Sequence, residues 1–169
     1  LWLFSAALLP VLFPAIAATR VREPARAAAL FDRGLRITGL VLLPAALVLV
    51  LFAYEGLALW LGAPFARDAA PVLRWLTVAV FANTLAQVPY ALIQGGGRAD
   101  LAARLHLLEL PLYLALLWAL LHRFGIVGVA LAWLVRMLGD GLAMLVASRR
   151  VLPEAGAAVR HGIVLMLGG

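Results

Sequence analysis

The stretch Leu105–Ala147, LHLLELPLYLALLWALLHRFGIVGVALAWLVRMLGDGLAMLVA, decides the fold of this 169-residue chain. It contains two apolar runs, 105–121 and 126–147, separated by only a few residues around Phe124-Gly125. Each run is long enough to cross a ~30 Å hydrocarbon core as a helix that rises ~1.5 Å per residue. Because the connection is so short, we predict two antiparallel neighbouring helices inside a membrane.

The same pattern continues on both sides of this stretch. Further apolar runs cover 1–18, 37–54 and 70–94, and another opens near Gly162. The chain is 66% hydrophobic and 13% charged, with a mean hydropathy of +1.06, and a soluble domain of this length could not bury so much apolar surface. We therefore predict an all-α fold, a single polytopic transmembrane bundle over residues 1–169 with about six spans. The chain begins inside an apolar run without an initiating Met, so we expect a fragment of a longer membrane protein.

Basic residues gather in alternate connections between these runs. The connections after the runs 70–94 and 126–147, and the one between 1–18 and 37–54, carry ten arginines: Arg20, Arg22, Arg26, Arg33, Arg36, Arg98, Arg104, Arg149, Arg150 and Arg160. The other two connections carry only Arg67 and Arg123. The positive-inside rule predicts that the connections rich in arginine face the cytoplasm. This orientation signal also explains the net charge of +6, so no nucleic-acid partner is expected.

Two short segments in the arginine-rich connections have sequence patterns that indicate local backbone structure. Glu23-Pro24 is typical of a helix start, and residues 25–35 are predicted to form either a short amphipathic helix on the inner membrane surface or a solvated connector. Gly95-Gly96-Gly97 predicts a tight turn. A phosphate-binding P-loop is disfavoured there, because the preceding strand and the lysine of that motif are missing.

Ionisable side chains inside the predicted spans are the first candidates for function. Each costs roughly 2.5–3.5 kcal/mol to insert unless it finds a partner or a water-filled cavity. Arg136 and Asp140 lie one turn apart on the run 126–147, and they predict either an internal salt bridge or part of a polar pathway. We expect Glu109 and Asp140 to come together in the inner half of the bilayer, since their two runs are joined by a short turn.

The run 105–121 carries polar residues along one face. His106, Glu109 and Tyr113 follow one another at spacings of three and four residues, which places them on the same side of a helix. His106 is interpreted as an interfacial residue at a helix start. Glu109 is interpreted either as the ion-pair partner of Arg104 or Arg136, or as part of a cluster of acidic and basic groups with Asp140.

Uncharged polar residues form a second stripe, on the run 70–94. Asn83, Gln87 and Gln94 are spaced by four and seven residues. Such a stripe can line a passage for cargo rich in hydroxyl or amide groups, or it can join helices at about 0.6 kcal/mol per hydrogen bond. Prolines within or at the ends of the spans, among them Pro89, predict kinks. Gly128 and Ala132 predict a face for close helix packing.

Several motifs carry a family resemblance. They are Ala91–Gly95 with Arg98, then His106–Tyr113, and then Phe124–Ile126 with Gly128. Together they resemble the polysaccharide-exporter branch of the multidrug/oligosaccharidyl-lipid/polysaccharide transporter superfamily, over nearly the whole chain. The resemblance implies half of a two-bundle transporter, similar to the second bundle, in the bacterial inner membrane. It also implies three partners: membrane lipid, a polyprenyl-linked oligosaccharide and the remainder of the transporter.

On this resemblance we expect a flippase or exporter that works by alternating access and catalyses no covalent step. The expected substrate pathway contains seven residues: Arg136, Asp140, Glu109, Asn83, Gln87, Gln94 and Tyr113. In this hypothesis the guanidinium of Arg136 attracts a lipid-linked phosphate or pyrophosphate, and the side-chain amides meet sugar hydroxyls.

Three other functions remain open: a cation-coupled multidrug exporter, an integral-membrane glycan polymerase or transferase, and a purely structural subunit. The chain has no cysteine, and Glu109 and Asp140 lie on separate runs rather than in a paired-carboxylate motif. Convergent catalytic groups are not evident in the sequence, so we expect no enzyme, no cofactor and no metal site.

Overall fold

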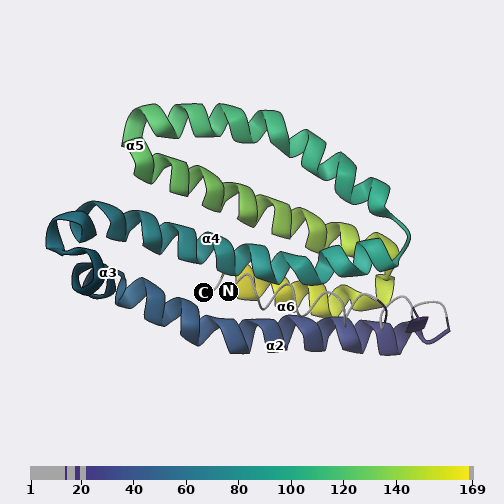
Figure 1. The fold of residues 1–169 in the computed structure, drawn as a ribbon. Helices are drawn as coiled ribbons and strands as arrows, with labels where there is room; N and C mark the ends of the chain where they lie inside the picture. The colour runs from purple at the N-terminus through teal and green to yellow at the C-terminus, as the bar shows by residue number, and fades with distance from the viewer. Residues whose placement is uncertain (1–13, 15–17, 20–21, 168–169) are drawn as a thin grey trace.

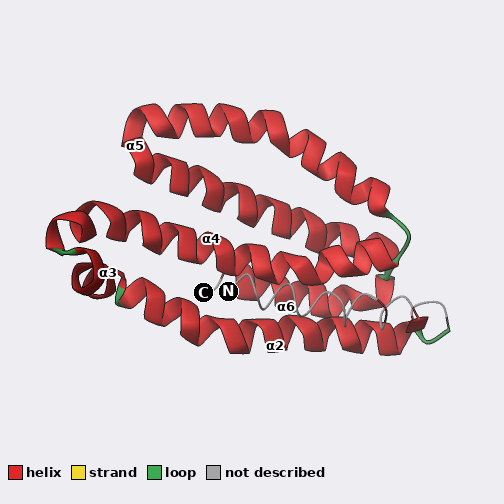
Figure 2. Cartoon of the chain, viewed as in Figure 1, coloured by secondary structure: helices red, strands yellow, loops and turns green. Residues whose placement is uncertain are grey.

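The computed structural model describes residues 14, 18–19 and 22–167. Most of the predicted span 1–18 lies outside these residues, so that span stays a prediction. The elements are α2 (Pro24–Leu51), α3 (Ala53–Leu61), α4 (Ala63–Gly95), α5 (Ala99–Val151), the short 3₁₀ helix η1 (Pro153–Ala155) and α6 (Gly156–Leu167). The described part of the chain is helical and contains no strand (Figures 1 and 2), which confirms the all-α prediction. Within it, α2, α4 and α5 are long and apolar enough to cross a membrane.

Helix α5 is a hairpin with two arms. At Gly125 the backbone takes φ 59° and ψ −138°, a conformation that glycine adopts easily and other residues avoid. The chain reverses there, and Figure 1 shows the two halves of α5 running back along one another. We call residues 99–124 the first arm and residues 126–151 the second arm. The predicted runs 105–121 and 126–147 lie within these arms, so the prediction of antiparallel neighbours is confirmed.

The two arms approach each other very closely beside the turn. A Cβ atom added to Gly128 would lie 2.0 Å from the carbonyl oxygen of Leu120 in the first arm. Ala132, one turn further along the second arm, is fully buried. The small residues predicted to permit close helix packing therefore do so, with Gly128 against the backbone of the opposite arm.

Helix α4 is the central helix of the described bundle, packing against α2, α3, α5 and α6. Its most apolar stretch is 67% buried, whereas that of α5 is only 11% buried. The core around α4 is built from residues of four helices: Phe31, Leu35, Leu85, Leu92, Leu145 and Val159. Large apolar side chains on α2 and α5, such as Leu40 and Leu112, remain exposed. An exposed apolar surface of this kind suits contact with lipid tails.

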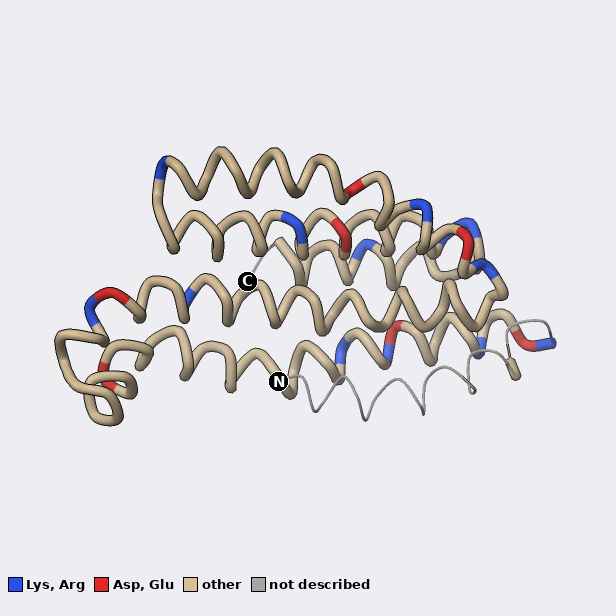
Figure 3. Tube along the Cα trace, turned by 45° about the horizontal axis from the view of Figure 1, so that its top comes forward, with Lys and Arg blue, Asp and Glu red and all other residues tan. Residues whose placement is uncertain are grey.

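Charged residues mark the two ends of the bundle differently. One end of the bundle holds the last residues of α4, the first and last residues of α5, and the first residues of α2 (Figure 1). Figure 3 shows most of the basic positions at this end, which we call the basic end. The arginine-rich connections thus lie at one end of the structure, and the arginine-poor connections lie at the other. That the basic end faces the cytoplasm stays a prediction.

Helix boundaries differ from the predicted spans most clearly in α2. The helix begins at Pro24, with the proline at its first position, so the predicted helix start is confirmed. The alternatives proposed for residues 25–35, a separate surface helix or a solvated connector, are both wrong. One helix continues to Leu51, because Ala27, Phe31 and Leu35 bury their side chains in the core around α4 and α6.

The turn between α4 and α5 is stabilised by its glycines. The amide of Gly97 donates to the Gln94 carbonyl (2.8 Å) and the amide of Arg98 donates to the Ile93 carbonyl (3.1 Å), which is the hydrogen-bond pattern of a Schellman helix end. Gly97 has φ +70°. The side-chain Nε atom of Arg98 also donates to the Asp100 carboxylate (3.2 Å), and this hydrogen bond lowers the pKa of that carboxyl. Asp100 lies in the first turn of α5, where a negative charge interacts favourably with the helix dipole. The predicted tight turn is confirmed.

We expect Gly97→Ala to lower the free energy of unfolding of the full-length protein by about 1–2 kcal/mol, because an alanine is strained in the left-handed conformation. Nothing lies within 4 Å of the added methyl group, so strain is the whole effect. Thermal unfolding in detergent, followed by tryptophan fluorescence, measures the change. Gly56→Ala is the matched control, since Gly56 is also in open space but has an ordinary helical backbone. An equal loss of stability in both variants would contradict this account of the turn.

Candidate functional site

Polar side chains from α4 and both arms of α5 meet inside the described bundle. They line two cavities of about 170 and 360 Å³. We call the following residues the polar cluster: Asn83, Gln87 and Tyr90 from α4, His106, Glu109 and Tyr113 from the first arm, and Arg136 and Asp140 from the second arm. Because Arg136 and Asp140 line both cavities, the second arm connects them. Asp140 lies ~17 Å along the helix axis from the end of the second arm, in the half nearer the basic end.

The smaller cavity lies between the two arms and is dominated by Arg136. The guanidinium carbon of Arg136 lies 5.0 Å from the centre of the Tyr113 ring, within the range of a cation–π contact. The Nε atom of Arg136 is buried and has no hydrogen-bond partner among the described residues. In this part of the chain Arg136 forms no ion pair with Asp140, so the predicted internal salt bridge is absent. A half-buried cation whose Nε donor has no partner among the described residues therefore lies beside a cavity.

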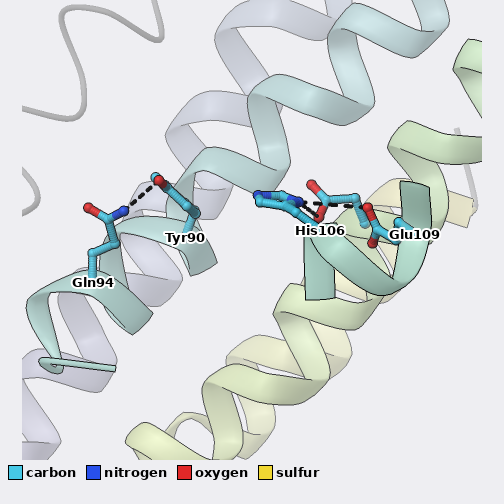
Figure 4. A network of polar contacts seen from close by, with 5 residues as sticks. Tyr90, Gln94, His106 and Glu109 are labelled. Atoms are coloured by element: carbon cyan, nitrogen blue, oxygen red, sulfur yellow. Dashed lines mark hydrogen bonds and ion pairs between the residues drawn. The ribbon is translucent and has the colours of Figure 1, made fainter. Parts of the chain in front are cut away.

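His106 joins the acidic groups of the two arms. Its Nδ1 atom lies 3.3 Å from Oδ1 of Asp140 and 3.7 Å from Oε2 of Glu109. Figure 4 shows the imidazole directed toward the carboxylate of Glu109. All three atoms are buried and lack a hydrogen bond of acceptable geometry. His106 contacts the opposite arm, and its interpretation as an interfacial residue stays a prediction.

The acidic residues come together as expected from the short turn, but with a different partner. Glu109 makes no ion pair with Arg104 or Arg136 within the described residues; instead its Oε2 atom lies 3.7 Å from Nδ1 of His106. The predicted cluster of acidic and basic groups is thus present in the geometry, with histidine in place of arginine at its centre. Its role in a substrate pathway stays a prediction.

The amide stripe of α4 divides into two parts. Asn83 and Gln87 line the larger cavity, together with Tyr90. Gln94 lines neither of the two cavities; its side-chain nitrogen donates to the Tyr90 hydroxyl (2.5 Å), and the Tyr90 ring lies 6.4 Å from the His106 ring (Figure 4). Within the described residues, Gln94 is therefore linked to the polar cluster through Tyr90.

Two members of the polar cluster, His106 and Tyr90, were not among the pathway residues expected from the sequence. The spacing of His106 and Glu109 on one helix face was a usable signal, but it could not show that the face meets Asp140. Tyr90 adjoins the amide stripe, and it enters the site because α4 directs that face toward α5. Both omissions arise from contacts between helices rather than within one.

Comparison with known proteins supports the resemblance seen in the sequence. No protein-family model matches the chain, and no solved structure matches it either. A protein of Shigella flexneri described as "Putative O-antigen transporter" is 30% identical over 113 residues, which is 67% of this chain and 27% of the relative. The match thus spans about a quarter of the relative's length. This match covers about two thirds of the chain and confirms its resemblance to the polysaccharide-exporter branch of transporters.

Proposed function

We propose that this chain is part of a bacterial inner-membrane transporter that moves a lipid-linked oligosaccharide or polysaccharide precursor across the bilayer by alternating access. The observation that carries the proposal is the half-buried cation Arg136, whose buried Nε donor has no partner among the described residues, beside a cavity between apolar helices. Intramembrane ionisable groups of this kind mark substrate pathways by default. The class of cargo is supported by the similarity to the O-antigen transporter.

The polar cluster has the chemistry that such a cargo needs. The planar guanidinium of Arg136, held over Tyr113, matches phosphate oxygens and would receive the phosphate or pyrophosphate of a polyprenyl-linked sugar. Asn83 and Gln87 offer both donors and acceptors to sugar hydroxyls across the larger cavity. Asp140 lines both cavities and would accept hydrogen bonds from hydroxyl groups.

Alternating access needs a second group of helices against which this bundle can move. The described helices line cavities of about 170 and 360 Å³, which are small for a glycan. In our proposal the remainder of the transporter forms the opposite wall, as in a two-bundle transporter, and membrane lipid contacts the exposed apolar faces of α2 and α5. The polar cluster would then be one side of a larger pathway.

Proteoliposomes containing the full-length transporter test this function. A fluorescent polyprenyl-diphosphate oligosaccharide should become accessible to an impermeant quencher on the opposite side, while a lipophilic cationic dye should not be moved. Movement of the dye without the glycolipid would favour a cation-coupled multidrug exporter instead. Mass spectrometry of the recovered glycolipid checks the remaining alternative, since a longer or transferred glycan would indicate a polymerase or transferase.

A further inference from the structure

The three groups at the centre of the polar cluster have the spacing of metal ligands. Nδ1 of His106, a carboxylate oxygen of Glu109 and a carboxylate oxygen of Asp140 all lie within 4.8 Å of one another. Around a tetrahedral ion with ligand distances of ~2.0–2.2 Å, neighbouring ligand atoms are ~3.3–3.6 Å apart. The observed distances from His106 to Asp140 and Glu109 are 3.3 and 3.7 Å. Two of the three separations are therefore close to those between ligands of one ion.

The electrostatics of the same three groups favour a cation between them. Asp140 is only 8% exposed and Glu109 is half-buried. The Oδ1 atom of Asp140 and the Oε2 atom of Glu109 are buried and have no hydrogen-bond partner among the described residues. Two carboxylates held near each other away from water repel strongly. Arg136 does not relieve this repulsion through an ion pair in the described part of the chain, because its guanidinium lies over Tyr113.

We infer that His106, Glu109 and Asp140 form a binding site for a divalent transition-metal ion, such as Zn²⁺, that links the two arms of α5. One imidazole nitrogen with two carboxylates suits Zn²⁺ and its first-row neighbours, whereas Mg²⁺ and Ca²⁺ prefer oxygen ligands alone. Three protein ligands leave the fourth coordination position of a tetrahedral ion open, next to the cavities that these residues line.

The ion would have a structural consequence for the hairpin. His106 and Glu109 belong to the first arm and Asp140 to the second, so the ion would hold the arms together far from the Gly125 turn. The site does not depend on the proposed cargo, because ion binding can be measured without transport. Failure of one proposal therefore leaves the other standing.

Cobalt titration of the full-length transporter tests the site. The protein is purified in detergent, stripped with a chelator and titrated with Co²⁺, whose visible absorption reports four-coordinate binding, and Zn²⁺ is then added as competitor. We expect one Co²⁺ per chain that Zn²⁺ displaces. His106→Ala, Glu109→Gln and Asp140→Asn should each weaken binding by more than about 100-fold, the upper end for loss of an outer-shell partner.

His122→Ala is the matched control. His122 lies near the hairpin turn, where its Nδ1 atom is 2.8 Å from the Trp118 carbonyl, so its removal should leave Co²⁺ binding unchanged. Gel filtration and melting temperature without metal show that each variant is folded; Asp140→Asn preserves the side-chain shape if His106→Ala does not fold. Absence of the cobalt spectrum, or its persistence at the original affinity in His106→Ala or Asp140→Asn, would overturn the inference.

Discussion

Gly128→Ala should destabilise the full-length protein by roughly 3 kcal/mol or more, at the upper end of the cost of overpacking. The added methyl carbon would lie 2.0 Å from the carbonyl oxygen and 2.4 Å from the carbonyl carbon of Leu120. Both are backbone atoms, so no side chain can rotate away to make room. The two arms of α5 must separate beside the turn, and the packing that brings Glu109 toward Asp140 is weakened.

Gly139→Ala is the matched control for this change. Gly139 lies in the same arm, but nothing is within 4 Å of the added methyl group. Alanine is the better helix former by roughly 0.5–1 kcal/mol, so this variant should be as stable as the parent or slightly more so. Thermal unfolding in detergent compares the two variants. If Gly128→Ala melts at the same temperature as Gly139→Ala, the arms do not touch at Leu120.

The second large effect is expected in transport. Arg136→Ala should reduce the rate of glycolipid movement in proteoliposomes roughly 10- to 100-fold, since a hydrogen bond to a charged group contributes ~1.5–3 kcal/mol and 1.4 kcal/mol corresponds to tenfold. Arg136→Lys should fall between parent and alanine variant, because lysine keeps the charge but loses the planar pair of donors. The measurement is the quenching assay with the polyprenyl-diphosphate oligosaccharide.

Arg74→Ala controls for loss of an intramembrane arginine in general. Arg74 is exposed on α4, and its Nε atom donates to the Val50 carbonyl (3.1 Å) at the end of α2, where helix carbonyls lack partners. This variant should transport at nearly the parental rate. A fully active Arg136→Ala variant that inserts normally would remove Arg136 from the mechanism, and tolerance of Glu109→Gln and Asp140→Asn as well would favour a structural subunit.

Much of the fold was predictable from local sequence. Apolar runs of membrane length and the short connection at Phe124-Gly125 were enough to predict the hairpin of α5, because both signals act within a few residues. The start of α2 at Pro24 was equally local. Its continuation through residues 25–35 was not, since Phe31 and Leu35 need the side chains of other helices to bury them.

The candidate site shows the same division. Helical spacing by itself determined that Arg136 and Asp140 share a face, that His106 and Glu109 share another, and that Asn83 and Gln87 share a third. Only the tertiary structure decided which faces meet. Asp140 contacts His106 rather than Arg136, and Arg136 rests on Tyr113, because Gly128 lets the arms of α5 pack backbone to backbone and α4 closes the third side. Spacing along a helix is set by its geometry, whereas the partner across an interface is set by close packing between helices distant in sequence.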